Sequence, residues 1–175
     1  MDEKKGFTLI ELMVVIVILG ILVSIGTFAF QSSQQKSRDS RRKADLDQVT
    51  RALEMYENDN GGYPVGGTTG VDSGKIIGCG DTPKIACSWG SIFSNTTKAT
   101  YMIKLPKDPK SDVTGYYYES VGKGYRLYAR LENSNDTSIP TTGSKEYNQN
   151  CGVGSTIYCN YVLSSPSVVE PTPKP

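Results

Sequence analysis

Residues 7–30 read FTLIELMVVIVILGILVSIGTFAF, and Glu11 is the only charged side chain in this run. An α-helix rises about 1.5 Å per residue, so roughly 20 apolar residues span the hydrocarbon core of a bilayer. We therefore expect residues 7–30 to form a transmembrane helix. A charge inside such a helix costs about 2.5–3.5 kcal/mol on insertion scales. The position of Glu11 therefore predicts a functional role and a partner for its carboxylate.

The residues ahead of the apolar run do not form an ordinary secretory signal. Charged residues 2–5 lead directly into Gly6, whereas a signal peptide is cut after its apolar region. Cleavage between Gly6 and Phe7 would keep the apolar run on the mature chain and create an α-amino group one helical turn before Glu11. This ammonium group could pair with the carboxylate within one chain or between neighbouring chains. A plain single-pass anchor is the alternative, and it explains neither Gly6-Phe7 nor Glu11.

This N-terminal segment resembles the processing and methylation site of type IV pilins and pseudopilins, through the stretch Lys5-Gly6-Phe7-Thr8-Leu9-Ile10-Glu11-Leu12. The resemblance implies that a prepilin peptidase removes residues 1–6 and N-methylates Phe7. It implies that Glu11 neutralises the N-terminus of an adjacent subunit during assembly. It also implies an α+β fold, in which a long N-terminal helix packs on a small antiparallel β-sheet head, with residues 7–30 forming the filament core.

The composition of the 175-residue chain argues against several classes of function. It has no histidine, which removes the commonest general base and the commonest metal ligand. It has neither a Gly-x-Ser-x-Gly motif nor a phosphate-binding loop, so we expect no enzymatic activity, no cofactor and no metal site. The net charge of +1 gives no global case for nucleic-acid binding. A nucleic-acid role would rest only on the basic block at residues 36–43, which is better explained as a solvated helix face.

The four cysteines fall into two pairs with identical spacing: Cys79 and Cys87, then Cys151 and Cys159. Neither pair has the close spacing of a zinc or redox motif. On the outer side of a membrane, disulfides are favoured over free buried thiols, which are the alternative. Four cysteines allow three pairings. We expect the local one, because close chain ends cost least to bring together.

Residues 31–60 are polar and have helical periodicity. The apolar positions recur at helical spacing: Leu46, Val49, Leu53 and Tyr56. They predict an amphipathic stalk helix that packs on the head through one stripe. Gly61-Gly62 and Pro64 mark its end. No strong breaker interrupts the chain before this point, so we expect one long helix from about residue 7 to residue 59.

The stalk helix also has a charge polarity, with basic residues first and acidic residues after them: Lys36, Arg38, Arg41, Arg42 and Lys43, then Asp45, Asp47, Glu54, Glu57 and Asp59. In a staggered array of parallel helices, the basic block of one subunit would lie beside the acidic block of the next. We therefore expect Arg41, Arg42 and Lys43 to face Asp45, Asp47, Glu54 or Glu57 of neighbours. The alternative is that both blocks are solvated, since exposed pairs are individually weak.

Residues 61–163 are expected to form the globular head. Residues 61–90 are rich in Gly, Thr, Asp and Ser and are predicted to be a loop. Residues 116–120 and 125–131 predict an antiparallel hairpin with one buried face, carrying Tyr125 and Leu127, while Tyr128 lies on the other face. Residues 157–163 predict a further strand. Residues 164–175 contain four prolines and little to bury, which predicts disorder.

The head is similar to that of the major type II secretion pseudopilins and of a group of short bacterial pilins. The similar stretches are Asp59-Asn60-Gly61-Gly62-Tyr63-Pro64, Leu105-Pro106-Lys107-Asp108-Pro109 and the tyrosines of residues 116–128. The secretion pseudopilins bind calcium in an acidic loop near the C-terminus. The corresponding residues 132–136 lack a cluster of carboxylates, so we expect no metal there. The disulfides instead resemble a pilin's substitute for the ion.

Together these features predict a structural subunit of a type IV pilus-like, homo-oligomeric helical filament. Its subunits would lie in the inner membrane with the head outside, and then enter a cell-surface or periplasmic filament. The implied partners are the prepilin peptidase, an inner-membrane platform protein and a separate assembly ATPase. The alternatives are a pseudopilin of a type II secretion or DNA-uptake (competence) system, and a minor tip pilin that binds DNA or a surface.

Overall fold

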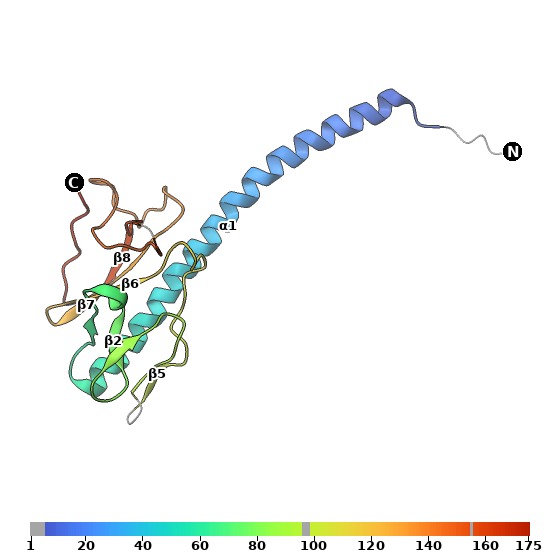
Figure 1. Cartoon of the computed structure of the whole chain (residues 1–175). Coiled ribbons are helices and arrows are strands. Elements are labelled where there is room, and N and C mark those ends of the chain that lie inside the picture. Colours follow the sequence, from blue (N-terminus) through green and yellow to red (C-terminus); the bar gives the residue numbers. More distant parts are fainter. Residues whose placement is uncertain (1–5, 96–98, 155) are drawn as a thin grey trace. The chain divides into compact units, whose positions relative to one another are not determined.

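The computed structural model describes residues 6–95, 99–154 and 156–175. The chain divides into two compact units, Met1–Ser37 and Arg38–Pro175. Helix α1 runs from Leu9 to Asn60 and is followed by short antiparallel sheets (Figure 1). This arrangement confirms the α+β, pilin-like fold class.

Helix α1 has the extent that its sequence predicts, since it contains no proline and its apolar positions keep helical spacing. The helix ends where Gly61 adopts a positive φ of 74° and its N–H donates to the carbonyl of Glu57 at 2.7 Å. Glycine takes this left-handed conformation without the steric cost of a Cβ atom. The glycine pair therefore stops the helix as expected.

The core of the second unit lies against one stripe of α1. Leu46, Val49, Leu53 and Tyr56 are all buried, and they pack with aromatic and aliphatic residues of the sheets. Tyr56 stacks on Phe93 with 5.6 Å between ring centroids. The stalk helix is thus held to the head by the predicted stripe.

A three-stranded antiparallel sheet replaces the loop that was expected over residues 61–90. It consists of β1 (Val65–Gly66), β2 (Ile76–Cys79) and β3 (Ile85–Cys87), in the order β1-β2-β3, with the short 3₁₀ helix η1 (Gly70–Asp72) between β1 and β2. These strands are too short for a clear alternation of apolar and polar residues. The loop prediction was therefore wrong in this region. The next two strands, β4 (Phe93–Ser94) and β5 (Thr100–Met102), pair with each other.

The third sheet contains the predicted hairpin. Strands β6 (Tyr117–Val121) and β7 (Gly124–Ala129) are joined by the two-residue turn Gly122-Lys123, and β8 (Tyr161–Ser164) pairs with the other edge of β7. Gly122 has a positive φ of 57°. The hairpin prediction is confirmed, and the register follows from the short turn.

The hairpin does not have a single buried face. Tyr128, expected on the outer face, is 0% exposed and packs in a second cluster with Tyr147, Cys151 and Cys159. The rings of Tyr128 and Tyr147 have centroids 5.6 Å apart. The prediction was wrong because a later segment of the chain packs over this face. The alternation of residues along one strand does not show which other segments pack on it.

The C-terminal residues 165–175 pack on the head, in contrast to the disorder that was expected for residues 164–175. The carbonyl of Lys174 accepts from the N–H of Ser144 at 2.9 Å, and the N–H of Lys174 donates to Glu146 at 2.7 Å. Arg126 Nη2 donates to the carbonyl of Val169 at 2.8 Å. The difference arises because hydrogen bonds to the backbone attach this segment to the head. The prediction of disorder considered only how few apolar side chains the segment can bury.

Candidate processing and assembly site

The N-terminus of α1 is capped by three hydrogen bonds between Thr8 and Glu11. The N–H and hydroxyl of Thr8 donate to Glu11 Oε2 at 2.8 and 2.7 Å, and the N–H of Glu11 donates to Thr8 Oγ1 at 3.3 Å. Since α1 begins at Leu9, Thr8 is the N-cap and Glu11 the third helical residue, which is a capping box. The Thr-x-x-Glu spacing is a sequence signal for this motif, and the sequence analysis missed it.

The cleavage position lies just outside this cap. Gly6 and Phe7 are exposed and precede the helix, and the side chain of Phe7 is 85% exposed. A peptidase can therefore reach the Gly6–Phe7 bond without unwinding a helical turn. Leader residues 1–5 lie outside the described residues.

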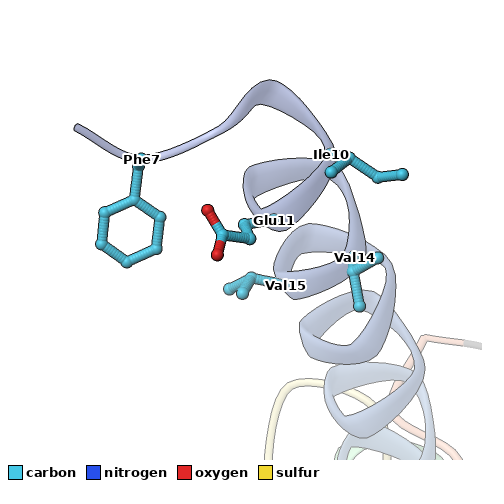
Figure 2. Close-up of a pocket in the computed structure, with 5 residues that line it drawn as sticks. All are labelled: Phe7, Ile10, Glu11, Val14 and Val15. Atoms are coloured by element: carbon cyan, nitrogen blue, oxygen red, sulfur yellow. The ribbon is translucent and has the colours of Figure 1, made fainter. Parts of the chain in front are cut away.

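Phe7 and Glu11 line a shallow cavity of about 350 Å³ together with Ile10, Val14 and Val15. Figure 2 shows the Phe7 ring and the Glu11 carboxylate on the same side of the helix, while Ile10 and Val14 lie on another side. Both hydrogen bonds from Thr8 go to Glu11 Oε2. Among the described residues nothing bonds to the other carboxylate oxygen, Oε1, which can accept from a further donor.

The large apolar side chains at the start of the first unit are exposed. From Phe7 to Val23 the large apolar residues are each 46–85% exposed, which is far more apolar surface than a soluble monomer leaves in water. Among the described residues, no helix combines the length and the hydropathy that crossing a membrane requires.

A buried ionic cluster ties α1 to two loops of the head, and we call it the Arg42 cluster. Its members are Arg38, Asp39, Arg42, Asp108, Lys110 and Glu132. The side chain of Arg42 is 0% exposed, and its Nε and Nη2 donate to the two carboxylate oxygens of Asp108 at 2.7 and 2.9 Å. Its Nη1 donates to Asp39 at 2.7 Å and to Glu132 at 2.9 Å. Such fork-shaped, charge-assisted bonds are the strong hydrogen bonds of proteins.

The remaining members satisfy the carboxylates that Arg42 leaves partly free. Glu132 also accepts from Arg38 and from Lys110 Nζ, each at 2.7 Å. Asp39 accepts from the backbone N–H groups of Glu132 and Asn133. Hydrogen bonding from Arg38 holds the pKa of Glu132 well below its ordinary value. For Arg42, burial acts to lower the pKa, and the hydrogen bonds that it donates to its three acidic partners raise the pKa above the ordinary value.

These contacts correct the expected charge pairing between neighbouring subunits. Arg42 is not available to a neighbour, because its partners lie within the same chain. Asp45 is buried and accepts from the hydroxyl of Tyr116 at 2.7 Å, and Lys43 Nζ bonds to Asp136 at 2.7 Å. Of the seven residues in the expectation, Arg41, Asp47 and Glu54 are exposed and Glu57 is partly exposed. Helical spacing predicted the buried apolar stripe but could not reveal the long-range partners of its charged neighbours.

In residues 132–136, the stretch compared above with a calcium loop, the carboxylates form ion pairs with lysine and arginine side chains of the same chain. Glu132 forms ion pairs with Arg38, Arg42 and Lys110. Asp136 forms one with Lys43. In the part of the chain that the structure describes, no three acidic, cysteine or histidine side chains gather closely enough to hold a metal ion.

Two disulfides close short loops of the head. They join Cys79 to Cys87 and Cys151 to Cys159, with Cα atoms 5.4 and 5.2 Å apart. These are the local pairs predicted from the sequence. Cys79 and Cys87 belong to the main core, and Cys151 and Cys159 to the second cluster beside Tyr128. Each bridge therefore stabilises the packing of one core.

Known proteins share both the N-terminal segment and the head. Residues 1–27 match the family model described as the prokaryotic N-terminal methylation motif. Type II secretion system core protein G of Escherichia coli is 33% identical over 108 residues, which are 62% of this chain and 68% of that protein. The core protein G of Dickeya chrysanthemi is 30% identical over 153 residues, covering 87% and 91%, and that of Pseudomonas aeruginosa is 32% identical over 128 residues, covering 73% and 82%. No solved structure matches this chain.

A helix that begins at a methylation motif and continues into a small antiparallel head defines a subunit of a pilus-like filament. The chain belongs to the type IV pilin and pseudopilin family, together with the type II secretion system core protein G. This membership supports filament formation and processing by a prepilin peptidase in general.

Proposed function

We propose that this chain is a pseudopilin of a type II secretion system. The observation that carries the proposal is the extent of the similarity: the Dickeya relative matches over 153 residues, whereas the methylation motif covers only residues 1–27. The N-terminal motif alone does not separate pili from pseudopili. The similarity of the head therefore supports the secretion branch of the family.

Processing begins at the exposed bond between Gly6 and Phe7. The prepilin peptidase removes residues 1–6 and methylates the new α-amino group of Phe7. This group carries a positive charge at neutral pH, since an α-amino group has a pKa near 8. The chain then starts with an ammonium group next to the capped first turn of α1.

Glu11 acts in assembly as the acceptor for the ammonium group of an adjacent subunit. Thr8 holds Oε2 of Glu11 and leaves Oε1 for this second donor. In an apolar surrounding the pair is stabilised by mutual attraction, while either charge alone would be strongly disfavoured. Each Glu11 therefore favours binding of one N-terminal ammonium group from one adjacent subunit.

Before assembly the apolar side chains of residues 7–30 lie in the inner membrane, with the head on the outer side. On assembly the same side chains pack against other copies in the filament core. The chain has no phosphate-binding loop, so a separate ATPase acting through an inner-membrane platform protein supplies the energy. The subunit itself is structural and has no enzymatic role.

The test is deletion of the gene followed by two measurements on the same cells. Loss of a secreted protein from the medium, with its retention in the periplasm, is the result expected for a secretion pseudopilus. A surface pilus is the second candidate, favoured by the two disulfides, and it predicts loss of surface filaments with normal secretion. Mass spectrometry of the mature protein should give Phe7, N-methylated, as its first residue. An intact Met1 would overturn the processing step.

A further inference from the structure

A cavity of about 620 Å³ lies in the second unit, between strand β8 and the C-terminal segment. It is lined by Tyr147 and by parts of three segments: residues 137–142, residues 161–163 and the tail residues Glu170, Pro171 and Pro173. The volume falls within the range of small-ligand sites, which is roughly 300–1,000 Å³. Neither the N-terminal site nor the Arg42 cluster uses these residues.

The tail wall of this cavity is held in place by hydrogen bonds on both sides of it. Before the wall, the carbonyl of Val169 accepts from Arg126 Nη2 at 2.8 Å. After it, the N–H of Lys174 donates to the carbonyl of Glu146 at 2.7 Å. Residues 170–173 lie between these two bonds and are fixed in the folded head. Pre-formed walls favour binding, because less conformational freedom is lost on association.

Tyr147 presents a free hydroxyl to this cavity. The residue is 4% exposed, and its ring meets that of Tyr128 edge to face, with 5.6 Å between centroids. The hydroxyl is not fully enclosed, and it has no hydrogen-bond partner among the described residues. Because the rest of the side chain is packed in the second cluster, the hydroxyl opens into the cavity that the residue lines. A polar group at such a position is available to bond a ligand.

Tyr161 and Glu170 supply two further polar groups that lie near this hydroxyl. Neither the hydroxyl of Tyr161 nor the carboxylate of Glu170 has a hydrogen-bond or ion-pair partner within the described part of the chain. Burial and the negative charge of Glu170 raise the pKa of Tyr147. Burial and nearby carboxylates, Glu170 among them, raise the pKa of Tyr161. The carboxylate of Glu170 therefore lies within electrostatic reach of both hydroxyls.

The cations near this cavity do not neutralise Glu170. No lysine or arginine is found among the described residues that line the cavity. Lys43, whose Nζ lies 5.6 Å from the ring centroid of a wall residue, is already matched by a carboxylate at 2.7 Å. Lys174 directs its Nζ onto another ring, 3.5 Å from the centroid of Tyr158, and Lys145 is exposed. The cavity thus carries one unmatched negative charge and favours a cation.

We propose that this cavity binds the side chain of an arginine from a partner polypeptide. The guanidinium group donates to the carboxylate of Glu170 and to the hydroxyl oxygens of Tyr147 and Tyr161, while the alkyl part packs on Pro140 and Pro171. Arginine suits the site better than lysine does, because its planar fork bonds a carboxylate through two N–H groups and packs on aromatic rings. The site is the same whether the filament serves secretion or forms a surface pilus.

The ¹⁵N-labelled full-length protein in detergent micelles is titrated with the peptide acetyl-Gly-Arg-Gly-amide. We expect saturable NMR shifts at the backbone amides of Tyr147, Tyr161 and Glu170. The matched probe carries citrulline in place of arginine, which keeps the shape of the side chain and removes its charge. It should bind about two- to fivefold more weakly, as the loss of one exposed charge pair predicts. A peptide with lysine in place of arginine should also bind more weakly.

The variant E170Q should weaken binding of the arginine peptide to the level of the citrulline peptide and leave binding of the citrulline peptide unchanged. Y147F removes a hydroxyl that has no internal partner, so it should weaken binding of both peptides without lowering the unfolding temperature. The control is E54Q, which neutralises an exposed carboxylate of α1 and should match the unmodified protein.

Thermal unfolding of each variant checks that the fold is retained. The proposal is overturned if no saturable shifts occur, if the arginine peptide binds no more tightly than the citrulline or the lysine peptide, or if E170Q or Y147F behaves like E54Q. It is also overturned if sodium chloride at equal ionic strength reproduces the shifts.

Discussion

Replacing Arg42 with Met removes the cation at the centre of the Arg42 cluster and keeps a long apolar side chain in its place. Four charge-assisted bonds of 2.7–2.9 Å are lost. Asp108, whose side chain is 0% exposed, then retains, among the described residues, the hydroxyl of Thr114 and the backbone N–H of Lys110 as donors. Breaking a buried ion pair by removing one partner costs about 3–5 kcal/mol, since the other charge stays buried. Glu132 is less affected, because it keeps Arg38 and Lys110.

The assay is thermal unfolding of the full-length chain in detergent, followed by the emission of Trp89. A loss of 3–5 kcal/mol lowers the midpoint by roughly 10–20 °C for a unit of this size. The control is R41M, an exposed neighbour on the same helix turn, for which surface substitutions predict a change within about 0.5 kcal/mol. Adding D108N to R42M should recover part of the loss, because the unpaired charge is removed. If R42M unfolds at the same temperature as R41M, the Arg42 cluster contributes nothing to stability and the reasoning fails.

Three further predictions concern the N-terminus, acid stability and the second disulfide. E11Q should keep the capping box, because Gln also bonds to the N-cap, yet it should abolish filaments in electron micrographs. The control T8A should weaken the cap by about 1 kcal/mol and still allow assembly. Filaments of normal number from E11Q would refute the role of the charge. The pKa of Glu132 is lower in the folded chain than its ordinary value of 4.5, so its contribution to stability is complete above that pH and is lost as the pH falls further. The urea midpoint should therefore fall between pH 5 and 3, and E132Q should flatten this dependence; an unchanged acid slope in E132Q would assign the effect to other groups. Replacing Cys151 and Cys159 together by Ser should cost about 2–3 kcal/mol in urea unfolding, and equal midpoints with and without the bridge would contradict this value.

The sequence predicted the elements that depend on neighbouring residues. Helix α1 and the hairpin of β6 and β7 follow from periodicity and from a two-residue turn, so both were found. The capping box of Thr8 and Glu11 was also within reach of sequence reasoning, since its three-residue spacing is a local signal. Cleavage at Gly6–Phe7 and the assembly role of Glu11 rest on resemblance and stay predictions.

The Arg42 cluster could not be predicted, because it joins residues that are far apart along the chain. Arg42 is 66 positions from Asp108 and 90 from Glu132. On a helical wheel Arg42 lies on the same face as Leu46 and Val49, which separates it from the exposed Arg41, but the wheel does not show which carboxylates it meets. Tyr128 was misplaced for a related reason, since its cover comes from residues beyond position 140. Burial on the second face of a strand is decided by the tertiary fold.

A subunit held in a filament by one helix must carry tension from that helix into its head. Asp39 and Arg42 lie within the first five residues of the head unit, which begins at Arg38, and their partners Asp108 and Glu132 lie on two separate loops. A pull transmitted through α1 therefore reaches these bonds early in the head unit. The two bonds between Arg42 and Asp108 share the load and must break together, since one guanidinium forms both. We therefore expect a filament whose subunits lack the Arg42 cluster to rupture at lower force, even where the unloaded head remains folded.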